Sequence, residues 1–186
     1  MIDSIKAELK RSAETISSID PEQIRQAAEV ITRSMRAGNK IIFMGNGGSS
    51  ADAQHIAAEF SGKYMMDRPA MPGMSLSNIA PVTAIGNDYS YDLVFKRQIE
   101  AHCRQGDIVV GLSTSGNSKN VVLAMERAKE LGAITISFTG DGGVMREMAD
   151  VAVVIPSKET VSRRVTSAPV TQSVESSSAR CSARSV

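Results

Sequence analysis

Short apolar runs alternate with segments of helical length through most of the chain, and this alternation limits the possible fold more than any other feature of the sequence. The runs cover residues 40–44, 108–112, 133–138 and 151–155, with a shorter one near 74–76. The helical segments between them cover residues 50–62, 91–104 and 118–131. Apolar strands of about five residues that alternate with helices are typical of a parallel sheet covered on both faces. The sequence therefore predicts an α/β fold, a doubly wound parallel sheet whose ligands bind at the carboxyl ends of the strands.

Two helices are expected ahead of the first strand. Apolar residues recur at mostly helical spacings over residues 2–18, and Asp20 followed by Pro21 is a helix start, because the acid accepts free N–H groups and proline fits the first turn. The second helix should run to about Arg36. The apolar stripe of the first helix has no expected partner within its own domain, so a subunit interface is one use for it. Its members are Ile2, Ile5, Leu9 and Ile16.

Length and composition exclude several classes of protein. The chain has 186 residues and 42% apolar content, enough for one domain with a substantial core and too little for two ordinary ones. A net charge of +1 without a long basic block gives no sign of nucleic-acid binding. No apolar stretch approaches the roughly 18 residues of a membrane span, and no signal-peptide pattern begins the chain, so we expect a cytoplasmic protein. Cys103 and Cys181 lack the spacing of a disulfide framework or a zinc knuckle, which favours reduced, incidental thiols.

Residues 161–186 differ in composition from the rest of the chain. They are rich in Ser and Arg, contain no Leu, Ile, Phe, Met or Gly, and show no regular periodicity. Such a segment cannot bury enough apolar surface to offset its ordering entropy, so the sequence predicts disorder there. We expect a single domain over residues 1–160, with N-terminal helices in 1–37 and an α/β core in 38–160.

A glycine-rich turn runs directly from the first strand into a helix, with the sequence GNGGSSADAQHIAAE over residues 45–59. A turn of this kind leaves backbone N–H groups available to a ligand. His55 and Glu59 are four residues apart and share one helical face, where they could hold a metal ion or a substrate. The alternative is a surface pair worth only a few tenths of a kcal/mol. Asp52 could contact sugar hydroxyls or cap the helix, and the pattern does not separate the two.

A second polar loop, STSGNS over residues 113–118, also lies between a strand and a helix. Its hydroxyl groups and the N–H groups of the following helix could cradle a phosphate without a lysine, because the helix dipole supplies the positive end. The alternative is a helix start capped by serines, which is common. Two such loops at the ends of parallel strands favour a phosphorylated ligand.

Three segments together resemble the sugar isomerase (SIS) domain of the phosphoheptose isomerase family: residues 45–62, 86–89 and 112–118. The resemblance extends over residues 1 to about 160. It implies a flavodoxin-like SIS sandwich with added N-terminal helices, assembled as a homotetramer. It also implies an enzyme, an aldose–ketose isomerase that interconverts D-sedoheptulose 7-phosphate and D-glycero-D-manno-heptose 7-phosphate and so supplies heptose for surface glycans.

The same resemblance implies roles for individual residues. Glu59 would be the catalytic acid/base, and His55 and Glu59 would be two of the zinc ligands. Substrate contacts would come from Asn46, Gly47, Gly48, Glu59, Asn87, Asp88, Ser113, Thr114, Ser115 and Ser118. Within this set the hydroxyl residues would hold the phosphate, the residues of the glycine-rich turn would line the sugar site, and Asn87 and Asp88 would act near a neighbouring subunit. A carboxylate suits the reaction, because a proton must leave the carbon beside a carbonyl and return to the adjacent carbon through an enediol.

The carboxyl-terminal segment departs from the family. There the family has a helix that begins Arg-Ile-Gln-Glu-x-His, and its Gln and His complete the zinc shell. Nothing in residues 157–186 matches it, and His102 is expected to be structural or exposed. We hypothesise a shifted reading frame, since suitable codons for residues 163–184, read one base earlier, encode QEGHISTGHTICGIVERALFGA. The chain as written would then keep only half a zinc site and have lost most of its activity.

Two other functions remain open on the sequence. The missing Gln/His half favours a non-catalytic SIS protein that binds a partner, like the relatives that associate with the replication initiator DnaA. A sugar-phosphate sensor would keep the phosphate loop and show ligand-dependent stabilisation without turnover.

Overall fold

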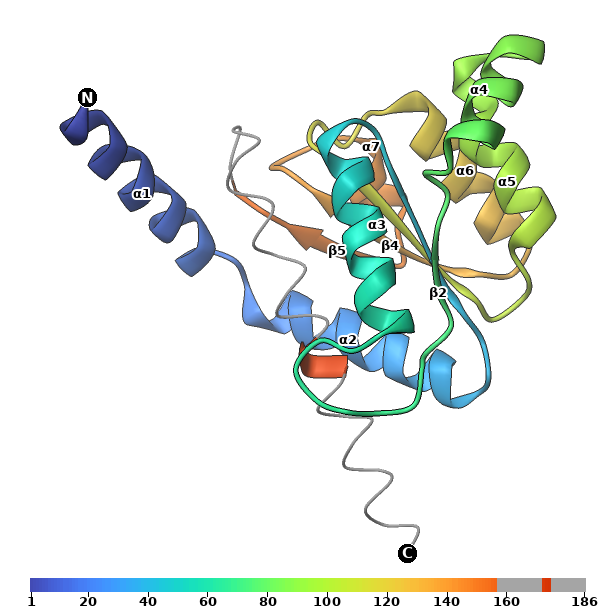
Figure 1. The fold of residues 1–186 in the computed structure, drawn as a ribbon, viewed down its shortest axis with the longest axis horizontal. Coiled ribbons are helices and arrows are strands. Elements are labelled where there is room, and N and C mark those ends of the chain that lie inside the picture. Colours follow the sequence, from blue (N-terminus) through green and yellow to red (C-terminus); the bar gives the residue numbers. More distant parts are fainter. Residues whose placement is uncertain (157–171, 175–186) are drawn as a thin grey trace, which may run out of the picture.

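The computed structural model describes residues 1–156 and 172–174, and its five strands form one fully parallel sheet in the order β2-β1-β3-β4-β5 (Figure 1). The strands are β1 (Ile41–Gly45), β2 (Gly73–Ser75), β3 (Ile108–Ser113), β4 (Ile134–Thr139) and β5 (Val151–Val154). The helices are α1 (Ile2–Ser17), α2 (Pro21–Arg36), α3 (Gly48–Ser61), α4 (Ile79–Asp88), α5 (Val94–His102), α6 (Lys119–Glu130) and α7 (Val144–Met148). This strand order is that of flavodoxin-like folds, so the predicted doubly wound α/β architecture is confirmed.

Helices cover both faces of the sheet, and each face has its own apolar core. On one face α2 and α3 pack on β1, β3, β4 and β5 through side chains such as Ile31, Phe60 and Ile136. On the other face α5, α6 and α7 pack on the opposite sides of the same strands, with Ile99, Met125 and Met145 fully buried. The helix expected over residues 91–104 is divided into a 3-10 turn, η1 (Tyr91–Leu93), and α5. Burial on both faces explains why β1 and β5 carry no polar side chain, whereas β4 alternates apolar residues with the buried Thr135, Ser137 and Thr139.

The register of the strands brings the two polar loops to one edge of the sheet. Gly45 pairs with Leu112, and Ser113 pairs with Thr139, so β1, β3 and β4 end side by side. The glycine-rich turn follows β1 and the Ser/Thr loop follows β3. Both therefore lie at the carboxyl edge, where doubly wound sheets bind their ligands.

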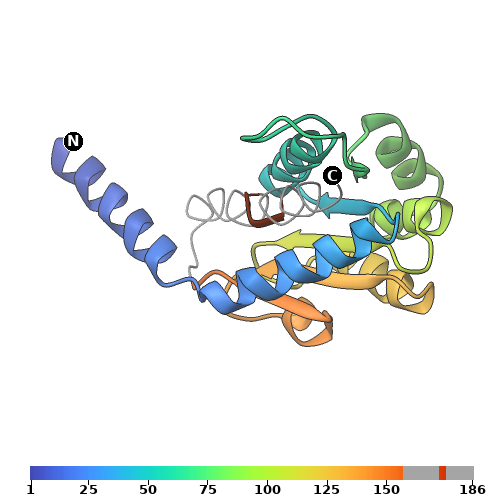
Figure 2. The ribbon, with the colours of Figure 1, turned by 90° about the horizontal axis from the view of Figure 1, so that it is seen from below.

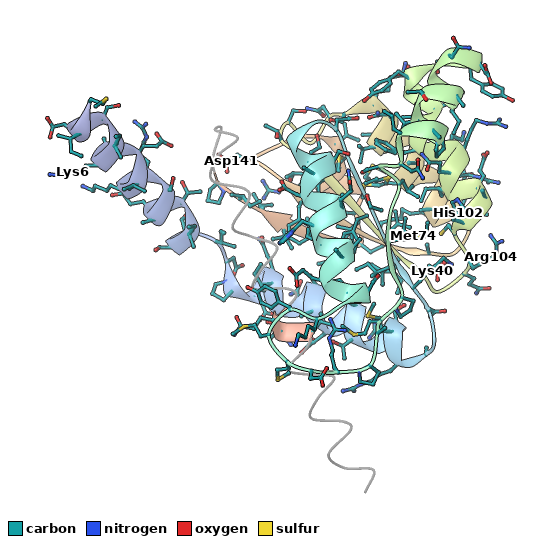
Figure 3. The ribbon with its side chains drawn as sticks, in the orientation of Figure 1. Lys6, Lys40, Met74, His102, Arg104 and Asp141 are labelled. Carbon is teal, nitrogen blue, oxygen red and sulfur yellow. The ribbon has the colours of Figure 1, made fainter. Side chains whose placement is uncertain are left out.

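An ion pair between partly exposed Lys40 and buried Asp107 joins the starts of β1 and β3 at the opposite, amino edge. The Asp107 carboxylate is 2.5 Å from the ammonium group of Lys40 and accepts hydrogen bonds from the backbone N–H groups of Lys40 and Arg104. Figure 3 places Lys40, Arg104 and His102 at this end of the molecule. Cys103 is buried beside them, and desolvation, followed by the nearby Asp107 charge, raises the pKa of its thiol. The thiol therefore stays protonated, which is consistent with an incidental cysteine.

Helix α1 projects away from the rest of the molecule and buries none of its residues (Figures 1 and 2). The predicted apolar stripe is present and in water: Ile2, Ile5 and Leu9 are 60%, 49% and 66% exposed. Asp20 caps the next helix as predicted, since its side chain accepts a hydrogen bond from the N–H of Glu22. A row of exposed aliphatic side chains on a helix without a partner is typical of a surface that another chain covers.

Most of the segment expected to be disordered, residues 161–186, lies outside the described residues. The exception is Gln172–Val174, a helical stretch in which Val174 is fully buried in the core between α2, α3 and the sheet. These three residues depart from the expectation of disorder, because one valine finds an apolar site even within a Ser-rich sequence. Within the described residues, no helix is both long and apolar enough to cross a membrane.

Candidate active site

The glycine-rich turn brings the start of α3 very close to the end of β1. A Cβ atom at Gly45 would lie 2.7 Å from the Cβ of Ser49 and 2.9 Å from its carbonyl carbon, so only glycine fits there. Helix α3 begins at Gly48 after Gly47, which makes no side-chain cap. Asp52 lies in the second turn and not at the cap, so of its two open interpretations the helix-cap one is wrong. Within the turn, the N–H groups of Ser49 and Ser50 donate to the carbonyl oxygens of Asn46 and Gly47.

The Ser/Thr loop does not use its serine as a helix cap. Ser118 is the N-cap residue of α6, but its side chain makes no capping hydrogen bond and instead lies 2.8 Å from the hydroxyl of Ser113. Ser113 is buried, whereas Ser115 is exposed. The first N–H groups of α6 thus keep their hydrogen-bonding capacity, and paired hydroxyls lie next to them. This arrangement favours the anion cradle over the serine-capped helix start.

A neighbouring segment, the loop of residues 140–143 with the start of α7, contacts the Ser/Thr loop. The N–H of Met145 donates to the carbonyl oxygen of Gly116, and the N–H of Val144 donates to the side-chain oxygen of Asn117. Gly116 has a φ of +68° and touches Gly142, leaving no room for a side chain. These contacts hold the Ser/Thr loop in one conformation.

We expect Gly116→Ala to destabilise the loop and weaken phosphate binding. The added methyl group would collide with the carbonyl oxygen of Gly142, and the positive φ would add about 1 kcal/mol of strain. Isothermal titration with inorganic phosphate should show at least a tenfold loss of affinity. Gly142→Ala is the matched control, since a Cβ atom there meets nothing within 4 Å. Equal affinities for the two variants would contradict this account of the loop.

A small pocket lies between the two loops. It is lined by the start of α3, the end of β3 and the residue after it, one side chain of β4 and the residue that follows β5: Ser49, Asp52, Leu112, Ser113, Thr114, Phe138 and Ile155. The lining is polar at the loop end and apolar along the sheet. A phosphate or a polyhydroxy compound would therefore find its donors and acceptors at the loop end.

The side chain of Asn46 ties the two loops together. It exchanges two hydrogen bonds, of 2.9 and 3.0 Å, with the side-chain amide of Asn120 at the start of α6. The Tyr91 hydroxyl, from η1, donates to the same Asn46 oxygen at 2.9 Å. The sequence motifs contain neither Asn120 nor Tyr91. The available signal was weak: Asn120 lies four residues before the core position Ala124, so helical spacing puts a polar amide on the buried side of α6.

His55 and Glu59 share one face of α3, as predicted. The His55 Nε2 and Glu59 Oε1 atoms are 3.5 Å apart, with side chains 68% and 20% exposed. Arg68, which sequence reasoning missed, donates to the carbonyl oxygens of Glu59, Phe60 and Gly62 and so fixes the end of this helix. Among the described residues, no group of three or more His, Cys, Asp or Glu could hold a metal ion. His55 and Glu59 therefore offer two donors of the types that zinc accepts, out of the usual four.

Two predicted contacts lie apart from the loops. Asn87 and Asp88 end α4, are exposed, and form a hydrogen bond with each other in which Asn87 Nδ2 donates to Asp88 Oδ1. In the described part of the chain, neither makes a hydrogen bond to the glycine-rich turn or the Ser/Thr loop. His102 is exposed and ends α5 near the amino edge of the sheet, which agrees with its interpretation as a residue outside the site (Figure 3).

Comparison with known proteins defines the class first. The family model described as "SIS domain" matches residues 5–140 of the chain. The solved structure of phosphoheptose isomerase GmhA from Neisseria gonorrhoeae superposes with a TM-score of 0.85 and 35% identity, covering 96% of this chain and 97% of that one. A phosphoheptose isomerase structure from Francisella tularensis gives 0.84 and 29%, over 93% and 95% of the two chains.

Curated relatives then narrow the class. A phosphoheptose isomerase of Geobacter sp. (strain M21) is 45% identical over 165 residues, which is 86% of either chain. One from Rhodospirillum rubrum is 52% identical over 139 residues, 74% of either chain. The chain belongs to the phosphoheptose isomerase family of SIS-domain proteins.

Proposed function

We propose that this fold binds sedoheptulose 7-phosphate and interconverts it with D-glycero-D-manno-heptose 7-phosphate, supplying heptose for surface glycans. The observation that carries the proposal is the joining of the two loops at the carboxyl edge of the sheet through Asn46 and Asn120, with Glu59 on the adjoining helix. The names of the curated relatives supply the reaction class.

In this proposal the residues divide the substrate between them. Ser113, Thr114, Ser115 and Ser118 hold the phosphate with their hydroxyl groups and with the N–H groups at the start of α6. Asn46, Gly47 and Gly48 line the sugar site, and Asn87 and Asp88 add contacts near a neighbouring subunit. Glu59 is four-fifths buried on α3. Its carboxylate takes the proton from the carbon beside the carbonyl and returns it to the adjacent carbon, passing through an enediol.

Zinc is the metal that the family resemblance implies. When bound, zinc would polarise the carbonyl group and stabilise the enediolate oxygens. His55 and Glu59 fit it in donor type but not in number, because a closed tetrahedral site needs four ligands. We therefore assign no step of the reaction to the metal and expect the described residues to hold it as a half-site only.

Self-association into a homotetramer, in the cytoplasm, is part of the proposal, and the stripe on α1 supports it. Leu9→Glu places a charge at the most exposed stripe position within the helix and should shift the chain to smaller species in light scattering. Burying an uncompensated carboxylate in an interface costs several kcal/mol. Ala7→Glu adds the same charge on the opposite face of α1 and should leave the mass unchanged. An unaltered mass for both variants would place the interface elsewhere.

The test of the proposed function is binding and turnover of sedoheptulose 7-phosphate. We expect the chain to bind it, with a ligand-dependent rise in Tm, and to show low turnover with added zinc. If the chain does not bind sedoheptulose 7-phosphate at millimolar concentration but binds another sugar phosphate, that other compound is the substrate. Turnover equal to that of an intact relative would contradict the impairment.

The two-donor metal site also favours a second candidate, a sugar-phosphate-binding SIS protein without catalysis. Such a protein would give the same rise in Tm and no isomerisation at any zinc concentration. A DnaA-associating protein would instead bind its partner without needing the sugar phosphate.

A further inference from the structure

We propose that Asn120 is a positioning residue, which sets the distance between the sugar-binding turn and the phosphate loop by holding the side chain of Asn46. The inference rests on the proposed function, since it assigns the sugar to one loop and the phosphate to the other. It adds a residue that belongs to neither motif and that touches neither half of the substrate.

The contact between the two amides is reciprocal. Asn46 Nδ2 donates to Asn120 Oδ1 at 2.9 Å, and Asn120 Nδ2 donates back to Asn46 Oδ1 at 3.0 Å. Asn120 is only 3% exposed, so water cannot replace Asn46 as its partner. Because a buried amide without a partner is costly, the pair resists separation more than a surface contact would.

Tyr91 adds a third contact to the same group. Its hydroxyl donates to Asn46 Oδ1 at 2.9 Å, so this oxygen accepts two hydrogen bonds and both its lone pairs are engaged. Asn46 can then offer a ligand only its remaining amide hydrogen. The sugar atom that it meets must be an acceptor, such as a hydroxyl or carbonyl oxygen.

The position of Asn120 in the chain explains why this contact matters for the substrate. Asn120 is the second residue of α6, the helix that begins directly after Ser118 of the phosphate loop. Asn46 is the first residue after β1. The amide pair therefore connects the two elements that hold opposite parts of one molecule, and a fixed spacing between them aligns the sugar with Glu59 while the phosphate is bound.

This role makes a prediction that distinguishes it from simple structural support. Inorganic phosphate engages only the phosphate loop, whereas sedoheptulose 7-phosphate engages both loops. Asn120→Ala should raise the Kd for sedoheptulose 7-phosphate roughly tenfold and leave the Kd for inorganic phosphate within about twofold, because one oriented polar contact is lost at the sugar end only. Isothermal titration of the full chain gives both constants and does not require turnover.

Three further variants complete the test. Glu126→Ala is the matched control, an exposed side chain further along the same helix, and should change neither constant. In an Asn46→Ala background, Asn120→Ala should add less than about twofold, because its effect passes through Asn46. Tyr91→Phe removes only a hydroxyl from an exposed residue and should raise the Kd for the sugar phosphate about threefold, which supports the proposal even where Asn120→Ala fails to fold.

The outcomes separate this inference from the proposed function. If Asn120→Ala weakens the binding of both ligands equally, the positioning role is overturned and Asn120 is an ordinary structural residue. The same conclusion follows if Asn120→Ala has its full effect on binding in the Asn46→Ala background. If Asn120→Ala leaves the Kd for sedoheptulose 7-phosphate unchanged, the positioning role is overturned as well. If the unaltered chain does not bind sedoheptulose 7-phosphate, the proposed function fails, and the positioning role fails with it.

Discussion

Replacing residues 163–184 by QEGHISTGHTICGIVERALFGA is expected to raise the turnover of sedoheptulose 7-phosphate on the order of a thousandfold. The replacement string restores the Gln-Glu-x-His pattern of the family, whose Gln and His would join His55 and Glu59 as zinc ligands. The family resemblance implies that the same His would act as a second acid/base, and such a group contributes about a hundredfold to ten-thousandfold. The rate is measured with both chains at equal zinc concentration.

Metal content provides a readout that is independent of activity. The restored chain should retain about one zinc ion per chain after dialysis, whereas the present chain should retain far less, because two donors bind zinc weakly. Replacing the restored Gln and first His by Ala is the matched control and should return both zinc and turnover to the level of the present chain. Equal turnover of the present and restored chains would contradict the prediction.

The gene itself tests the frame hypothesis. A shifted frame requires codons for residues 163–184 that encode the restored string when read one base earlier. Codons that are incompatible with that string would mean that the Ser/Arg segment is the natural sequence. The burial of Val174 against α2, α3 and the sheet shows that this face of the core accepts an apolar residue from beyond β5. An apolar helix, such as the restored string predicts, would supply several.

The layout of the fold was predictable because local patterns determine it. Five-residue apolar runs mark buried parallel strands, and the Asp20-Pro21 pair marks the start of α2, which the structure confirms. Both signals depend on neighbours within a few residues. The division of residues 91–104 into η1 and α5 was missed, because it depends on the packing of this segment against α4 and α6 and not on its own periodicity.

The candidate site was predictable only where a motif carries it. Ser113 and Ser118 were found because hydroxyls between a strand and a helix follow a known pattern, and their 2.8 Å contact agrees with it. Asn120 and Tyr91 contact Asn46 across 74 and 45 residues of chain, and no local signal encodes such a pairing. The guanidinium of Arg68 was missed for a related reason, since its partners are backbone carbonyls at the end of α3, which any sequence provides.

Glu59→Gln in the restored chain is expected to lower kcat by about a hundredfold to ten-thousandfold with a much smaller change in KM. Glutamine keeps the shape of the side chain but cannot take up the proton. A distorted helix is not expected to explain the loss, because the Arg68 guanidinium donates to the backbone carbonyl oxygen of residue 59. This contact holds the end of α3 whichever side chain residue 59 carries. The phosphate loop and the Asn46–Asn120 pair are untouched, so substrate affinity should survive.

Solvent deuterium exchange identifies the step that is lost. With Glu59 unaltered, the substrate should incorporate deuterium at the carbon beside its carbonyl group, and Glu59→Gln should abolish this exchange in parallel with turnover. Gln54→Ala is the matched control, an exposed neighbour on α3, and should change neither rate. If Glu59→Gln keeps more than a tenth of the turnover, another group removes the proton. Because loss of a zinc ligand would also slow the reaction, zinc content is measured in the same samples, and exchange that is abolished at full zinc occupancy assigns the proton transfer to Glu59.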